Sequence, residues 1–229
     1  MGAADAEVLS REGASVVVAD LNEADGRAVA ERVGGNAVFM KLDVTDEANW
    51  QQVIARTVEK FGRLDILVNN ATVVHDALTT SGPFWDKPLA LVDILDVGLR
   101  SHYTASWFAA PLLLANGEGL VVNTSSFGGR IYMHGPAYGA GKAGLDKMAH
   151  DMAVDFRPHR VAVVALWMGL LATERTQRVF AAEPDKYAGM AATAESPEFS
   201  GRVIDALARD PGLMDKSGRV WIGAELALE

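Results

Sequence analysis

Residues 14–20, ASVVVAD, form a short run of small and β-branched side chains that follows Gly13 and ends in a carboxylate. A run that is apolar nearly throughout, rather than alternating with polar residues, is typical of a strand buried on both faces of a parallel sheet. Asn22 stands where it can cap a following helix, and Glu23 and Asp25 place negative charge in the first turn of that helix. The stretch therefore predicts a strand that leads directly into a helix.

The same alternation continues along the whole chain. Further strands are expected at residues 37–42, 64–68, 119–123, 160–167 and 219–222, and helices at about 22–34, 45–62, 89–114, 136–156 and 199–208. Strands that alternate with helices form a parallel sheet with helices on both faces. The sequence thus predicts the α/β class, a doubly wound Rossmann-type sheet in three layers, as one domain over residues 1–229.

Composition excludes several kinds of function. The net charge of −9 argues against a nucleic-acid interface and against binding to an anionic membrane surface. The chain has no cysteine, so disulfides and thiolate chemistry are excluded, and its five histidines show no metal-ligand spacing, so no metal site is expected.

The start of the sequence has no signal-peptide pattern, and the longest apolar run, residues 161–172, falls well short of the ~20 residues that span a membrane. A soluble, cytoplasmic protein is expected.

Ligands of such sheets bind beyond the carboxyl ends of the strands. The residues in those places are Asp20, Asp43, Asn70, the pair Ser125-Ser126, and residues 168–169. A carboxylate at Asp20 can accept hydrogen bonds from both hydroxyls of an adenosine ribose and repels a 2′-phosphate, which favours NAD over NADP. An ordinary aspartate at a strand end is the alternative.

Tyr138 and Lys142 stand four residues apart near the start of an expected helix, which places the phenol and the ammonium on one face. A free phenol has a pKa near ~10, and a nearby positive charge favours the phenolate, so Tyr138 is a candidate general acid/base. A serine hydroxyl from Ser125-Ser126 could hold a substrate oxygen beside it. Each feature alone is also explained by an incidental pair or a strand-end turn.

Taken together, residues 42–44 (LDV), 69–71 (NNA), the two serines and the Tyr138-x-x-x-Lys142 spacing resemble the short-chain dehydrogenase/reductase family in its single-domain form. The likeness runs from Gly2 to about Ile222. The second half is also similar to the subgroup called dehydrogenase/reductase member one, through residues 97–100, 138–143 and 166–167.

The resemblance implies a hydride transfer between a nicotinamide and an alcohol or carbonyl carbon. Tyr138 would exchange the proton, Lys142 would lower the tyrosine pKa and hold the nicotinamide ribose, and Ser126 would orient the substrate. Ser125 has the usual spacing of 13 residues before the tyrosine, but strand alignment favours Ser126. Cofactor contacts are expected from Asp20, Leu21, Asp43, Val44, Asn70, Ala71, Tyr138, Lys142 and Gly169.

The sequence departs from the family pattern in four places. It begins inside the first helix, so the usual first strand and most of the glycine-rich turn are missing, and an upstream segment is expected. Thr72 replaces a glycine, Gly98 stands where many members carry an asparagine that helps a proton relay, and Met168 replaces a proline. A catalytically impaired member, or a binding or scaffold protein, is therefore the alternative function.

By the same resemblance, residues 170–200 form a lid over the substrate, and Phe180, Tyr187 and Met190 within it indicate a medium-sized apolar alcohol or ketone. Helices 89–114 and 136–156 are expected to build a homo-oligomer, a dimer or a tetramer. Core packing of the same helices is the alternative explanation of their apolar residues.

Overall fold

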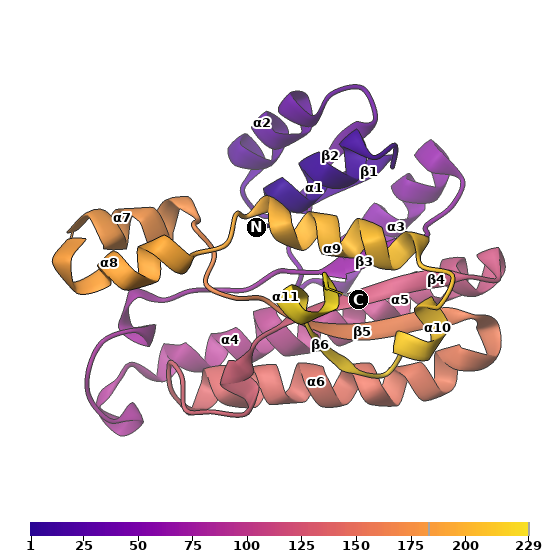
Figure 1. Cartoon of the computed structure of the whole chain (residues 1–229). Helices are drawn as coiled ribbons and strands as arrows, with labels where there is room; N and C mark the ends of the chain where they lie inside the picture. The colour runs from indigo at the N-terminus through magenta and orange to yellow at the C-terminus, as the bar shows by residue number, and fades with distance from the viewer. Residues whose placement is uncertain (183, 229) are drawn as a thin grey trace. The chain divides into compact units, whose positions relative to one another are not determined.

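The computed structural model describes residues 1–182 and 184–228, and the side chains of Lys186 and Tyr187 lie outside what it describes. Strands and helices alternate as expected (Figure 1). In chain order they are α1 Gly2–Arg11, β1 Val16–Asp20, α2 Glu23–Val33, β2 Ala37–Lys41, α3 Glu47–Phe61, β3 Ile66–Asn69, α4 Asp93–Leu95, α5 Ser101–Asn116, β4 Gly119–Ser125, α6 Pro136–Phe156, β5 Val161–Trp167, α7 Glu174–Ala182, α8 Pro184–Thr193, α9 Glu198–Arg209, α10 Leu213–Lys216, β6 Val220–Ile222 and α11 Gly223–Leu226.

The chain divides into two compact units, which are described separately. The first comprises Met1–Met40, Met168–Asp210 and Ile222–Glu229, and the second comprises Lys41–Trp167 and Pro211–Trp221. The strands pair in two separate sets, β1 with β2, and β3-β4-β5-β6 in that order.

The second unit holds a parallel sheet that is buried on both faces. Ile66 is level with Leu120 in the pairing of β3 with β4, and Gly119 is level with Val161 in the pairing of β4 with β5. Residues 161–166 of β5 are all buried, so side chains on both of its faces are shielded from water. This is the pattern that an unbroken apolar run predicts, and it confirms the α/β class.

Helices α5 and α6 cover one face of this sheet (Figure 1). The residues that pack together there come from both helices and from alternate positions of the strands. They are Ala109, Leu113, Val121, Ala149, Ala153, Phe156, Val161, Val163 and Ala165. Full burial of a side chain the size of Val or Leu stabilises a fold by about 1.5–3 kcal/mol, so this layer fixes α6 on the sheet.

The helix boundaries test the capping predictions. Asn22 Oδ1 accepts a hydrogen bond from Asp25 N, and Gly62 ends α3 in a left-handed conformation, so both predicted ends are confirmed. Thr45, where the sequence pattern starts the helix at 45–62, is not its cap as predicted. Asp46 caps α3, because its carboxylate accepts from two free N–H groups of the first turn, while Thr45 bonds to Asp43.

The helix expected at 89–114 runs without a gap as far as Asn116, but it is not α-helical throughout. Residues 89–92 form a 3₁₀ turn, α4 follows, and Asp96–Arg100 form a π turn before α5 begins. Gly98 lies in the middle of that wider turn, and glycine has a low propensity for a regular α-helix. Residues 168–198, which carry no clear periodicity, contain α7 and α8.

In the first unit, α1 packs closely on α9. A Cβ at Gly201 would come within 2.8 Å of Val8 Cβ, so the contact requires glycine. Asp5 is buried at this contact and accepts a hydrogen bond from Ser200 Oγ. Burial raises the pKa of the Asp5 carboxyl to about 6, although the Ser200 bond opposes the rise.

We predict that Asp5→Asn is more stable than the parent protein at pH 7 and equally stable at about pH 4. The folded-state pKa lies above the unfolded value, so the parent loses stability as pH rises from about 4 to about 6, by up to ~3 kcal/mol. Asparagine carries no charge and still accepts from Ser200. Urea unfolding at the two pH values measures this, with Asp25→Asn on exposed α2 as the control. A stability gain that is equal at both pH values would contradict the prediction.

Candidate active site

Strands β3 and β4 end at the same edge of the sheet in the second unit, because Asn69 and Asn123 are level in the ladder. The residues that follow these strands are Asn70-Ala71 and Ser126. Helix α6 begins ten residues after Ser126 and runs along β4 and β5. The topology therefore brings the start of α6 to the edge where the sequence places the candidate chemistry.

Ser126, Tyr138 and Lys142 meet at this edge. Ser126 Oγ lies 2.9 Å from Tyr138 Oη, and either hydroxyl can donate. Lys142 Nζ donates to Thr124 O at 2.8 Å and lies 5.7 Å from the centre of the tyrosine ring. All three predicted catalytic side chains are thus within one small cluster.

Two glycines allow this approach. A Cβ at Gly128 would lie 2.5 Å from Tyr138 Cε1, and a Cβ at Gly129 would lie 2.8 Å from Ala143 N. Ser126 Oγ accepts from Gly128 N at 3.1 Å, which fixes the turn that presents the serine hydroxyl to the tyrosine. These glycines were not predicted from the sequence. Their place three to four residues after a strand end is the signal that could have identified them.

The start of α6 also constrains Tyr138. Gly135 has φ +96°, and Pro136, whose fixed φ suits a first helical position, follows it. His134 has a positive φ of 57°, which is uncommon for a residue with a side chain. Its ring meets Tyr138 edge to face at 5.1 Å between centroids, so the side chain that precedes α6 packs on the phenol.

Burial controls the proton affinities in the cluster. Burial raises the pKa of the Tyr138 phenol, and the hydrogen bond with Ser126 opposes the rise. The net shift of the Tyr138 pKa is therefore upward, opposite to the lowering that the resemblance implies for Lys142. Burial also lowers the pKa of Lys142 to about 8, against the opposing charge of Asp146 one turn later. The ammonium thus titrates close to neutral pH.

The two neighbouring serines have different surroundings. Ser125 Oγ donates to Asp146 Oδ1 at 2.7 Å, and Trp167 Nε1 donates to the same oxygen at 3.0 Å. Ser125 is therefore occupied beneath α6, whereas Ser126 faces the tyrosine. This arrangement agrees with the preference for Ser126 from strand alignment.

The residues expected on the adenosine side of a cofactor are divided between the units. In the second unit, Asp43 Oδ1 accepts from Thr45 N and Thr45 Oγ1, which lowers the pKa of Asp43. Val44 O accepts from Trp50 Nε1. Asn70 is partly buried, and Ala71 O bonds to His102 Nε2 at 3.0 Å.

In the first unit, Asp20 ends β1 and is exposed, and its carboxylate accepts from Asn22 N at 2.8 Å. Leu21 is 62% exposed. Gly169 N donates to Glu195 Oε2 at 3.2 Å. These three residues are described within their own unit and are not placed against the cluster around Tyr138.

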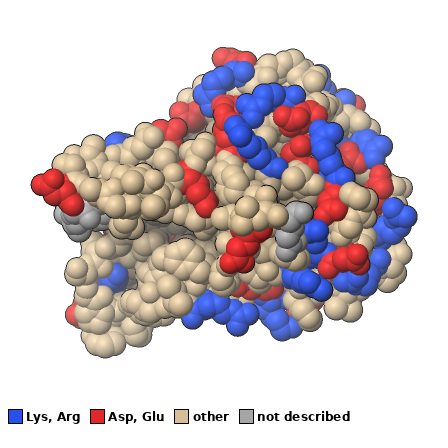
Figure 2. Space-filling model, in the orientation of Figure 1, with Lys and Arg blue, Asp and Glu red and all other residues tan. Residues whose placement is uncertain are grey.

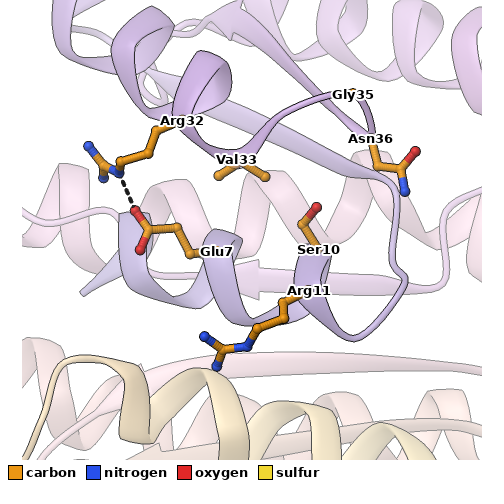
Figure 3. A pocket seen from close by; sticks show the side chains of 7 residues that line it. All are labelled: Glu7, Ser10, Arg11, Arg32, Val33, Gly35 and Asn36. Atoms are coloured by element: carbon orange, nitrogen blue, oxygen red, sulfur yellow. Dashed lines mark hydrogen bonds and ion pairs between the residues drawn. The ribbon is translucent and has the colours of Figure 1, made fainter.

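A pocket of about 500 Å³ lies between α1 and α2 in the first unit and contains none of the expected site residues (Figure 3). Its two arginines are already paired, Arg32 with Glu7 at 2.5 Å and Arg11 with Glu198 at 3.3 Å. Acidic and basic side chains lie among one another on the visible face (Figure 2).

Within the described part of the chain, no group of three acidic or histidine side chains is placed to hold a metal ion. None of the described helices is long and apolar enough to cross a bilayer.

Comparison with known proteins agrees with this geometry. The family described as short chain dehydrogenase matches residues 1–184. The chain belongs to the short-chain dehydrogenase family. It is therefore an oxidoreductase of the class that acts on alcohols with a nicotinamide cofactor.

Two relatives and one solved structure illustrate the likeness. Dehydrogenase/reductase SDR family member 1 of Mus musculus is 38% identical, over 96% of this chain and 74% of its own. Trans-4-hydroxycyclohexanecarboxylate dehydrogenase of Sinomonas cyclohexanicum is 32% identical, over 99% of this chain and 89% of its own. The crystal structure of gox2181 has a TM-score of 0.83 at 23% identity, covers 96% of this chain and 90% of its own, and supports the short-chain dehydrogenase fold.

We predict that Ser125→Ala lowers the free energy of unfolding of this short-chain dehydrogenase by about 1–3 kcal/mol, because it removes a donor from the buried Asp146 carboxylate. Ser126→Ala, which removes no donor from a buried carboxylate, is expected to cost less, about 1 kcal/mol. Chemical denaturation of both variants measures the difference. The opposite order of stability would contradict the contrast between the two serines.

Proposed function

We propose that this protein transfers hydride between NAD(H) and a secondary alcohol or its ketone, with Tyr138 as the general acid/base. The observation that carries the proposal is the 2.9 Å contact between Ser126 Oγ and Tyr138 Oη, with the Lys142 ammonium over the tyrosine ring. A substrate oxygen that bonds to both hydroxyls would lie where the phenol can take or give its proton.

Each side chain has a separate task. Ser126 orients the substrate oxygen through its hydroxyl, whose position is set by the bond from Gly128 N. Tyr138 takes the alcohol proton in oxidation and returns it in reduction. Lys142 supplies the positive charge that favours the phenolate, in a site where low water content strengthens the interaction.

The residues around Lys142 fit a nicotinamide nucleotide. An ammonium has three N–H donors, and the one described hydrogen bond of Lys142, to Thr124 O, leaves donors for the hydroxyls of a ribose. When bound, the nicotinamide supplies or accepts the hydride. Asp43, Val44, Asn70 and Ala71 are proposed to contact the adenosine side.

The preference for NAD rests on Asp20. Its exposed carboxylate uses one oxygen to accept from Asn22 N, so a second oxygen remains for a ribose hydroxyl. The negative charge disfavours a 2′-phosphate at the same place. Leu21 beside it and Gly169 are proposed to contact the adenine side and the nicotinamide, respectively.

A cyclic secondary alcohol is the proposed substrate class. Support comes from the relative named trans-4-hydroxycyclohexanecarboxylate dehydrogenase, which matches nearly the whole chain. The proposed lid, residues 170–200, contains α7 and α8 and carries the exposed Met190, which suits an apolar ring. Tyr187, also named for this role, has a side chain outside the described residues.

The second candidate function is that of a non-catalytic scaffold subunit, whose surface binds other subunits. Tyr103 and Trp107, one turn apart on α5, are 57% and 63% exposed, and Val154 on α6 is 64% exposed. Burial of such side chains between copies would stabilise a dimer or a tetramer. An active enzyme can use the same surface, so loss of turnover is what separates the two functions.

We predict that Tyr138→Phe lowers kcat for oxidation of cyclohexanol at least about 100-fold, because the acid/base hydroxyl is lost. Affinity for NADH, measured by quenching of tryptophan fluorescence, is expected to stay within a few-fold of the parent. Tyr132→Phe, at an exposed position before α6, is the control. Turnover that survives in Tyr138→Phe would contradict the assignment.

We predict that the parent protein binds NADH more tightly than NADPH, and that Asp20→Asn shifts the ratio of the two dissociation constants toward NADPH by about tenfold. Asparagine keeps an acceptor for Asn22 N and removes only the charge. Asp25→Asn, on the adjacent first turn of α2, is the matched control. An unchanged ratio in Asp20→Asn would show that this carboxylate does not select the nucleotide.

A further inference from the structure

A second polar cluster lies beneath the catalytic one and is not explained by it. Asn69, His102, Ser106 and Asn123 are all buried, each with at most 3% of its surface exposed. Asn69 Nδ2 is the common point, at 2.9 Å from Asn123 Oδ1, 3.1 Å from Ser106 Oγ and 3.4 Å from His102 O. Buried polar side chains are costly unless they have partners, so a cluster of four requires a reason.

Two atoms in this cluster have no hydrogen-bond partner, His102 Nδ1 and Asn123 Nδ2. The ring nitrogen on the other side, His102 Nε2, lies 3.0 Å from Ala71 O, which can only accept, so Nε2 carries the proton. In the neutral ring Nδ1 is then an acceptor, while Asn123 Nδ2 is a donor. The cluster thus holds one buried acceptor and one buried donor without partners, the two kinds of group that a water molecule can bond.

The ring is held neutral by its surroundings. Burial lowers the pKa of His102 to about 4, the bond to Ala71 O opposes this, and the charge of Lys142 lowers it further. Lys142 Nζ donates to the carbonyl of Thr124, the residue next to Asn123 on β4. The lysine head group and the Asn123 side chain thus lie at one end of β4.

The helix that carries His102 departs from regular α-helical geometry just before this residue. The π turn Asp96–Arg100 comes directly before His102, and π turns occur frequently at functional sites. Gly98, one turn earlier, has no side chain to offer a polar group. His102 is therefore the side chain of this helix segment that brings a free acceptor into the cluster.

We propose that His102 positions Lys142 through a buried water, which accepts from Asn123 Nδ2 and Lys142 Nζ and donates to His102 Nδ1. The inference rests on the proposed function, since it assigns His102 to the support of the Lys142–Tyr138 pair. The water gives the ammonium a second acceptor besides Thr124 O. Without it, burial destabilises the charged lysine further, and the phenolate of Tyr138 loses support.

The first test needs no turnover. In nitrogen-15 NMR of the full chain labelled at histidine, His102 is expected as the Nε2–H tautomer near neutral pH, with Nδ1 shifted as in a hydrogen-bonded acceptor. The Nδ1 signal should move in Lys142→Met and stay in place in Lys147→Met, whose lysine is exposed and pairs with Asp151. A free-acceptor shift, or a signal that ignores Lys142→Met, would overturn the proposal.

The second test separates positioning from folding. His102→Asn keeps an acceptor close to the place of Nδ1, whereas His102→Gln keeps a donor that can reach Ala71 O. We expect kcat to fall about tenfold or more in His102→Gln, with KM and NADH affinity unchanged, and to recover in His102→Asn. Equal losses in two variants of equal thermal stability would overturn the positioning role.

The two tests also distinguish the possible failures. If the parent binds no nucleotide and turns over no alcohol while the NMR coupling is present, the proposed function fails and the water site stands. If the parent is active while His102→Gln matches it in kcat, the proposed function stands and the role of His102 fails.

Discussion

Parallel strands that end together are the constraint on which the site depends. β3, β4 and β5 are paired in register, and Asn69 and Asn123 are level at the carboxyl edge. Because β4 and β5 are apolar and buried over most of their length, their polar residues gather at the carboxyl ends. The Asn69–Asn123 hydrogen bond joins two strand ends, and the groups that follow them lie at one edge of the sheet.

Close packing determines how near the turn after β4 lies to helix α6. Gly128 and Gly129 have no side chains, so the turn after β4 approaches α6 closely enough for Ser126 to touch Tyr138. The same burial raises the pKa of the tyrosine and lowers the pKa of Lys142 to about 8. Burial in the protein therefore disfavours both the phenolate of Tyr138 and the ammonium of Lys142. Positive charge from a bound nicotinamide favours the phenolate, and hydrogen bonds from Lys142 to acceptors favour the ammonium.

Sequence reasoning predicted most of the architecture, because buried parallel strands and their caps leave clear local patterns. The strand predicted at 14–20 forms as β1, but its residues are half-buried or exposed rather than buried, and the helix end expected at Gly62 is confirmed. The cap at Thr45 was assigned one residue early, because two adjacent polar residues can both cap and only the hydrogen-bond geometry decides between them. The π turn around Gly98 was missed because one glycine in a long apolar helix pattern leaves the periodicity intact.

The candidate site was predictable only in part, for a physical reason. Tyr138 and Lys142 are neighbours on one helix, so their spacing predicts their contact, whereas Ser126 reaches them only through a tertiary turn. His102 and Asp146 carry no local signal, because a buried histidine on an apolar helix and a helix aspartate are explained equally well by core and surface positions. Their importance depends on which atoms lack partners, which is a property of the folded chain.

The measurement that tests the central claim most directly is the fate of deuterium from cyclohexanol labelled at the carbinol carbon, incubated with NAD⁺ and the full chain. Proton NMR of the reduced nicotinamide is expected to show the label at its C4 position, in an amount equal to the cyclohexanone formed. Transfer of this kind, absent in Tyr138→Phe, is what hydride transfer at the Ser126–Tyr138–Lys142 cluster requires. Nucleotide binding without any label in the nicotinamide would contradict it and favour a binding or scaffold protein.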